Sequence, residues 1–447
     1  MQMKVAPLLI VALLGTASAQ AQLFYPETAM LENGMQMVVL PNDRAPVITQ
    51  MIWIKAGGTS DPWNRSGAAH FLEHLFFKGT KNHAEGDYSK IISRMGGTEN
   101  AMTSYDYTAY YATFGAQHLD EVMALEADRF ANWQVTDAQV STERDVILKE
   151  RQQTTDNKPL ARFWEHAYAA LYPNHPYQRP VLGWRSEMEK LDRTQVEDYY
   201  RTYYTPQNMI LVLSGDITLA KSQPLAEKYF GKLAHRDVPA RLSPAVPPLA
   251  GEQNLTMTSP LVQEAIWSRH YLTDPARPET IAQSDAQIIL AKILGDGRTG
   301  RLYRRLVVKD KIVTSADINF DPVTFGPARF SIIVTPEPNV ALDKIVATVD
   351  DEVNRLLKDG VTELEVKNAT QGLEIETTYA RDSVMGPAMI VGEALVSGLD
   401  LQAVESWPQR IRAITKESVM QAAQDILPHA PALTAILLPE KKEGKKK

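Results

Sequence analysis

The stretch that decides the fold is GAAHFLEHLFFKGT, residues 67–80, in which small and apolar residues recur at the spacing of a helix that buries one face. We predict a helix from Gly67 to Phe77, with Ser66 as its N-cap and Gly79 as its C-cap. Three polar side chains interrupt the apolar pattern at positions i, i+3 and i+4. They therefore share one face of this helix.

Strands and amphipathic helices alternate on both sides of this stretch. The first part of the chain has strand-like segments at 35–42, 45–57 and 209–217 and a predicted helix at 137–153. The second part repeats the plan weakly, with strands predicted at 264–272, 329–338 and 432–439 and a helix at 286–295. A proline-rich segment separates the two parts. We predict an α+β fold of two tandem homologous α/β units, each a mixed sheet packed with helices, at 22–235 and 253–440, joined by a linker at 236–252.

The composition excludes several classes of protein. Hydrophobic residues make up 44% and charged residues 23% of the 447 residues, as in an ordinary globular protein. A formal net charge of -7 argues against a nucleic-acid binder. With 0 cysteines the chain cannot form a disulfide, so any metal site must use histidines and carboxylates.

The two ends of the chain have compositions of their own. Residues 1–21 combine a basic start, a short apolar stretch and small residues, which is typical of a cleaved signal peptide. The apolar stretch is too short to span a bilayer, and none like it follows, so we expect an exported, periplasmic protein without a membrane span. The lysine-rich tail, residues 441–447, is interpreted as a solvated end.

The polar residues of the first predicted helix are His70, Glu73 and His74, and they suit a metal site. Two neutral imidazoles one helical turn apart can hold one zinc ion, and the carboxylate between them can take a proton from water. A catalytic zinc site takes three protein ligands, so a third must come from elsewhere. On the helix at 137–153, Glu143 and Glu150 are about two turns apart. We predict Glu150 as the third ligand and Glu143 as a carboxylate that orients a ligating histidine.

Each part of this pattern also has a plain structural interpretation. Two histidines at this spacing can be a buried structural pair, and two glutamates on a helix usually form a solvated face. It is the combination of the two helices that favours a metal site.

Here the sequence resembles a known family. The segment 67–80 followed by Glu150 is similar to the inverted zinc-peptidase motif of the pitrilysin/insulinase family, and especially to the catalytic subunit of mitochondrial processing peptidase and its bacterial relatives. The resemblance is dense in the first unit and reaches the second only in outline. It implies a chain that forms half of a clamshell chamber. It also implies His70, His74 and Glu150 as ligands of one Zn²⁺ and Glu73 as the general base.

The resemblance further implies that Asn100 and Ala101 lie on an edge strand that pairs with the substrate backbone. Residues 101–114 are rich in Thr and Tyr, and an extended peptide can add to an open strand edge. The alternative is an interior strand, with Asn100 serving the preceding turn. Phe77 is predicted to line a side-chain pocket beside the metal, with a place in the core as the alternative.

One departure from the family points to a partner. Self-sufficient members carry an Arg and a Tyr, with six residues between them, that hold the substrate carbonyl. The matching positions here are Val307 and Thr314, and Arg301 and Tyr303 have the wrong spacing. The resemblance therefore implies a homologous partner subunit that supplies this pair.

We thus expect a zinc metalloendopeptidase that cleaves extended or unfolded peptides. The alternatives are a non-catalytic structural or chaperone-like member of the family, and a zinc-dependent assembly factor for an exported peptide.

Overall fold

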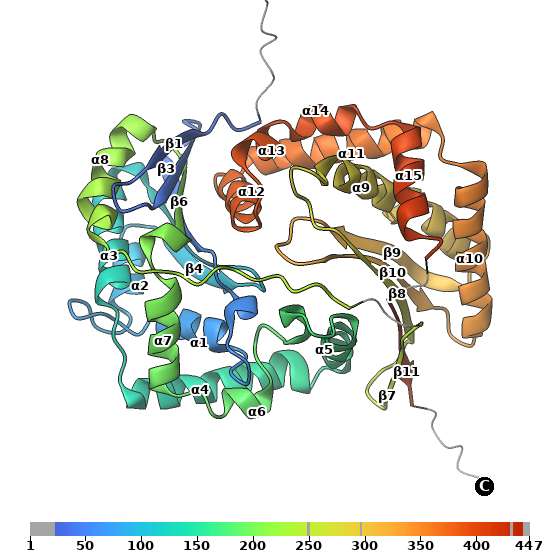
Figure 1. Ribbon diagram of the computed structural model, residues 1–447, viewed down its shortest axis with the longest axis horizontal. Helices are drawn as coiled ribbons and strands as arrows, with labels where there is room; N and C mark the ends of the chain where they lie inside the picture. Colours follow the sequence, from blue (N-terminus) through green and yellow to red (C-terminus); the bar gives the residue numbers. More distant parts are fainter. Residues whose placement is uncertain (1–22, 248–250, 296, 430–431, 441–447) are drawn as a thin grey trace, which may run out of the picture.

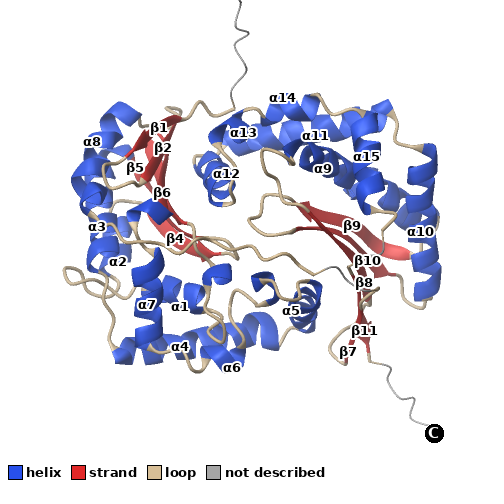
Figure 2. Ribbon diagram, viewed as in Figure 1, coloured by secondary structure: helices blue, strands red, loops and turns tan. Residues whose placement is uncertain are grey.

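A computed structural model describes residues 23–247, 251–295, 297–429 and 432–440. The predicted signal peptide and the basic tail lie outside these residues. Two mixed sheets, each packed with helices, follow one another along the chain (Figures 1 and 2). This arrangement confirms the predicted fold class of two tandem α/β units.

The first sheet has the strand order β1-β2-β6-β3-β5-β4. β2 and β6 run parallel, whereas the other neighbouring strands run antiparallel. The strands are β1 (Glu27–Met30), β2 (Gln36–Pro41), β3 (Val47–Ile54), β4 (Thr98–Thr103), β5 (Thr108–Gly115) and β6 (Met209–Gly215). β6 is buried along its whole length, as expected of an apolar strand between two others. β4 lies at one edge of the sheet.

The second sheet repeats this order without a counterpart of β1. Its order is β7-β11-β8-β10-β9, which corresponds to β2-β6-β3-β5-β4 of the first sheet, and its parallel pair, β7 with β11, corresponds to β2 with β6. The strands are β7 (Asn254–Ser259), β8 (Ile266–Thr273), β9 (Val313–Asp321), β10 (Ala328–Pro336) and β11 (Leu433–Pro439). The weak repeat in the sequence therefore corresponds to a shared topology.

Helices cover both sheets. Those of the first unit are α1 (Ala68–Leu75), α2 (Asp87–Arg94), α3 (Leu119–Asn132), α4 (Asp137–Arg151), α5 (Pro159–Leu171), α6 (Arg185–Met188), α7 (Arg193–Tyr203) and α8 (Leu219–Tyr229). Those of the second are α9 (Ile281–Gly295), α10 (Leu342–Asp359), α11 (Glu363–Asp382), α12 (Met385–Val396), α13 (Leu401–Glu405), α14 (Trp407–Arg412) and α15 (Lys416–Ile426). Each predicted element has its counterpart here; α9 begins five residues earlier than expected.

Each unit contributes one helix that packs against the sheet of the other unit. α12 of the second unit packs against β3 and β6 of the first sheet, where Ala388 and Val391 join a core cluster with Trp53. In return, α5 of the first unit packs against β7 and β11 of the second sheet, through a cluster that includes Phe163 and Leu437. Each sheet thus has apolar residues on a face that is covered by a helix of the other unit (Figure 2). Burial of these residues stabilises the contact between the two units.

No helix in the described part of the chain is long and apolar enough to cross a bilayer.

Candidate metal centre

The helix that carries the histidines, α1, is capped by a residue outside the quoted stretch. Both oxygens of the buried Asp61 carboxylate accept hydrogen bonds from its first turn, one from Gly67 N–H at 2.7 Å and one from Ala69 N–H at 2.9 Å. The predicted N-cap, Ser66, was wrong: its hydroxyl instead accepts a hydrogen bond from Trp184 N–H at 2.9 Å. The predicted C-cap was also wrong, because α1 ends at Leu75.

Two glycines allow a close backbone crossing at the start of α1. Gly67 has a φ of 88° and Gly183 a φ of 79°, both in the left-handed region that favours glycine. A Cβ on Gly183 would lie 2.3 Å from the carbonyl oxygen of Ser66, and one on Gly67 would lie 2.7 Å from that of Leu182. The segment before α6 can therefore press directly on the N-terminus of the helix.

The buried face of α1 orients its polar face. Phe71, Leu72 and Leu75 are fully buried in the core of the first unit. Their burial turns His70, Glu73 and His74 together toward α4, which contacts α1. The helix spacing read from the sequence is therefore realised in the structure.

The three expected ligand atoms converge. His74 Nε2 lies 3.4 Å and His70 Nε2 lies 3.9 Å from Oε2 of Glu150, and one ligand atom of each residue lies within 4.8 Å of the others. A zinc ion about 2.0–2.2 Å from each nitrogen and oxygen requires ligand atoms separated by slightly more than 3 Å. The residues present fit this donor set and this spacing.

A buried carboxylate forms a hydrogen bond with the His74 nitrogen that does not face Glu150. Glu143, which is 5% exposed, places Oε1 2.9 Å from His74 Nδ1, on the side of the imidazole away from Glu150. Its other oxygen forms an ion pair of 2.6 Å with Lys78 Nζ. Glu143 thus occupies the orienting position expected from the sequence, and Lys78 is an additional member that the sequence did not indicate.

The two histidines have different electrostatic surroundings. Burial and the neighbouring His74 lower the pKa of His70 to about 4, so this imidazole is neutral. Burial also lowers the pKa of His74, but its hydrogen bonds to Glu143 and Glu150 outweigh this effect and raise it to about 9. In the metal-free protein, His74 therefore carries a proton that a metal ion must displace.

Glu73 has a partner that sequence reasoning missed. The hydroxyl of Thr103, at the end of β4, donates a hydrogen bond of 2.6 Å to Oε2 of Glu73. Burial raises the pKa of Glu73, while this hydrogen bond opposes the shift. The net upward shift makes the carboxylate a better proton acceptor. The run of Thr and Tyr after Asn100 was the signal available, but only the tertiary structure shows which hydroxyl reaches Glu73.

The end of α4 is also anchored. Arg151, which follows Glu150, forms two hydrogen bonds to the Glu165 carboxylate, at 2.9 and 2.8 Å, and one of 2.7 Å to the carbonyl oxygen of Gly183. Beyond it the chain continues as a π-helix, Gln152–Asp156. A local change of helix type often accompanies a functional site, and here it directly follows the third expected ligand.

The expected substrate residues are not members of the ligand cluster. Asn100 and Ala101 are on β4, at the sheet edge, and the Ala101 N–H donates to the Asn100 side chain at 2.9 Å. Phe77 lies beyond the end of α1, half-buried, and lines a small pocket with Tyr88 and Arg129. Contact of these residues with a substrate stays a prediction.

The second unit has no such cluster among its described residues. Arg301 forms hydrogen bonds of 2.7 and 2.8 Å to the Glu365 carboxylate and donates to the Gly360 carbonyl oxygen, so its guanidinium is engaged within this unit. Val307 packs against the second core, and the Thr314 hydroxyl donates to the Thr335 carbonyl oxygen.

Comparisons with known proteins agree with this geometry. A family model described as insulinase (peptidase family M16) matches residues 37–184, and one described as the peptidase M16 inactive domain matches residues 190–373. The chain is 26% identical over 428 residues to the zinc protease PqqE of Helicobacter pylori, an alignment that covers 95% of each protein. It is 26% identical over 415 residues to a probable mitochondrial-processing peptidase subunit beta of Schizosaccharomyces pombe, covering 90% of this chain and 88% of that one. The crystal structure of a protease from Helicobacter pylori matches with a TM-score of 0.85 at 25% identity, covering 92% of this chain and 99% of that one.

Proposed function

Because the chain belongs to the M16 (insulinase) family of peptidases, we propose that it is a zinc-dependent endopeptidase that hydrolyses extended or unfolded peptides. The observation that carries this proposal is the convergence of His70, His74 and Glu150 around one point, with the half-buried Glu73 carboxylate on the same face of α1 as the two histidines. A structural or chaperone-like role would not require all four groups.

The chain's own residues define the chemistry. His70, His74 and Glu150 would hold the zinc ion, which when bound would polarise a carbonyl and make water more acidic. Glu73 takes a proton from the attacking water, because its carboxylate is on the same face of α1 as the histidines and burial raises its pKa. Thr103 holds that carboxylate in one orientation through its 2.6 Å hydrogen bond.

The edge strand suggests how a peptide is held. β4 has a free side, since it pairs only with β5 among the described strands. A peptide added along this side would pair with the main-chain groups of β4 that point away from β5, in the stretch that contains Asn100 and Ala101. It would run toward Thr103, the residue that contacts Glu73. Only an extended segment can pair in this way. Phe77 is proposed to contact a side chain of the substrate.

We further propose that this chain is the metal-bearing subunit of a periplasmic heterodimer, in which a homologous partner completes the chamber. Arg301 is bound to Glu365, and Val307 and Thr314 cannot replace the Arg and Tyr pair of self-sufficient members. A donor that stabilises the developing oxyanion contributes about 10²–10³ in rate, so the isolated chain should be slow.

The test is hydrolysis of an internally quenched, unstructured peptide library by the zinc-loaded chain, alone and with homologues from its own genome. Glu73→Gln should lower the rate by about 10²–10⁴ while one zinc ion remains bound. His74→Ala should abolish zinc binding. Asp145→Asn, an exposed change on α4, is the matched control and should leave both unchanged. Zinc binding without any hydrolysis dependent on Glu73, in every combination, would refute the peptidase proposal.

A further inference from the structure

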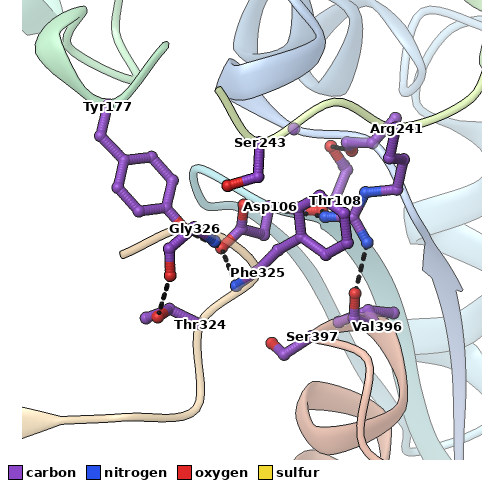
Figure 3. Close-up of polar contacts among 12 residues, drawn as sticks. Asp106, Thr108, Tyr177, Arg241, Ser243, Thr324, Phe325, Gly326, Val396 and Ser397 are labelled. Carbon is purple, nitrogen blue, oxygen red and sulfur yellow. Dashed lines mark hydrogen bonds and ion pairs between the residues drawn. The ribbon is translucent and has the colours of Figure 1, made fainter. Parts of the chain in front are cut away.

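The turn that closes the β4–β5 hairpin is bonded both to the first unit, through Gly58 and Thr59, and to the second unit. Asp106, in this turn, is 5% exposed. Its Oδ2 accepts a hydrogen bond of 3.0 Å from the backbone N–H of Phe325, which lies in the loop at 322–327 between β9 and β10. The same oxygen accepts a hydrogen bond from the Tyr177 hydroxyl (Figure 3). The turn and the loop therefore meet at one carboxylate oxygen.

The Tyr177 hydroxyl bonds to both the turn and the loop. Its hydroxyl donates to Asp106 and accepts a hydrogen bond of 2.8 Å from Gly326 N–H. A Cβ on Gly326 would lie 2.7 Å from the His175 ring, so a residue with a side chain would clash with the first unit at this position. One phenol oxygen thus connects the turn of the first unit with the loop of the second.

Arg241, in the segment between the units, contacts the same turn and loop. An Nη2–H of Arg241 donates to the Asp106 carbonyl oxygen at 3.0 Å, and its guanidinium lies 3.8 Å from the centre of the Phe325 ring. Nη1 donates to the carbonyl oxygen of Val396, at the end of α12 (Figure 3). Three segments far apart in the sequence therefore converge on the turn of the hairpin.

The same turn leads directly to the general base. Thr103, which donates to Glu73, lies three residues before Asp106, and a hydrogen bond of 2.8 Å from Ser104 N–H to the Tyr107 carbonyl oxygen closes the turn. A displacement of the turn must move the end of β4. It would then change the distance between the Thr103 hydroxyl and the Glu73 carboxylate.

We propose that Asp106 and Tyr177 are positioning residues through which the second unit, which lacks the metal ligands, holds Thr103 and hence Glu73 in place. This inference rests on the proposed peptidase function, because it gives the unit without a metal site a role in the reaction. Among the described residues, the hydrogen bonds of Asp106 and Tyr177 do not include His70, His74 or Glu150, so an effect on the site would pass through the hairpin.

The first experiment does not depend on catalysis. Hydrogen exchange of residues 98–108 is measured in the zinc-loaded full chain, its Tyr177→Phe variant and its Tyr172→Phe variant. Tyr177→Phe keeps the ring and removes one hydroxyl, and we expect exchange in the hairpin to accelerate about fivefold. Tyr172→Phe is the matched control, because the Tyr172 hydroxyl donates to the Pro327 carbonyl oxygen in the same loop, at 3.3 Å, and the hydrogen bonds of Asp106 do not include this hydroxyl. Unchanged exchange with Tyr177→Phe, or equal acceleration in both variants, would overturn the proposal.

The second experiment asks whether the effect passes through Thr103. Tyr177→Phe should lower kcat by about 2–10-fold with zinc stoichiometry unchanged. Combined with Thr103→Val, it should add no further loss, since the hydrogen bond through which it acts is already absent. Losses that multiply would show that Tyr177 acts independently of Thr103, and would overturn the proposal. If the wild-type chain shows no hydrolysis dependent on Glu73, either alone or with any homologue, the peptidase function fails, and hydrogen exchange alone decides the coupling.

Discussion

Removal of the Glu143 carboxylate tests the metal centre without assuming catalysis. Glu143 accepts from His74 Nδ1 at 2.9 Å and pairs with Lys78 Nζ at 2.6 Å, at a site that is 5% exposed. In Glu143→Ala the imidazole loses the group that selects its tautomer and orientation, and the Lys78 ammonium is left facing it. Both effects weaken zinc binding and leave the three ligands in place.

The expected loss can be estimated from the kind of contact removed. Removal of a carboxylate that orients a metal-bound histidine lowers metal affinity by about 10–100-fold, which corresponds to about 1.4–2.8 kcal/mol. Glu143→Gln keeps an oxygen that can accept from Nδ1 but loses the charge, so it should fall at the lower end of this range. Asp145→Ala, an exposed change on the same helix, should not alter affinity.

The assay is competition for zinc with a chromophoric chelator at neutral pH, with circular dichroism to confirm that each variant is folded. If folded Glu143→Ala binds zinc within about twofold of the wild type, Glu143 does not orient a ligand.

Three further predictions concern protons and packing. Zinc binding at neutral pH should release about one proton, and affinity should fall as the pH drops below about 9, because the metal displaces the proton of His74; calorimetry in buffers of different ionisation enthalpy measures this, and no release would contradict it. Burial opposes ionisation of Glu365, but its bonds to Arg301 and to the start of α11 lower its pKa to about 2, below the ordinary 4.5, so the stability from this ion pair is present above about pH 4.5 and lost as the pH falls toward 2. Urea unfolding at several pH values should show a shallower acid loss in Arg301→Met, and parallel curves would refute it. Gly183→Ala should lower the unfolding free energy by at least about 1–2 kcal/mol, since its φ is 79° and the new Cβ would lie 2.3 Å from the Ser66 carbonyl oxygen; thermal unfolding close to wild type would show that the crossing relaxes.

Local patterns in the sequence determined the elements and much of the candidate site. Helical periodicity placed His70, Glu73 and His74 on one face, and the two-turn spacing of Glu143 and Glu150 placed both on α4. Apolar runs bounded by turn residues predicted β2, β3, β6, β8, β10 and β11, and the weak repeat predicted two tandem units. The structure shows that these units also share a strand order. These features depend on residues close together in the chain, so their spacing alone carries the information.

Contacts between distant segments could only come from the tertiary structure. Asp61 rather than Ser66 caps α1; although it is close in the chain, it lies outside the usual N-cap position, so the cap pattern did not indicate it. Thr103 is one of many hydroxyls after Asn100, and only the placement of β4 beside α1 selects it as the partner of Glu73. The exchange of α5 and α12 between the sheets likewise depends on which apolar faces meet. Pairings over long sequence separations leave no local periodicity, so the physical basis of these features is the packing of the folded chain.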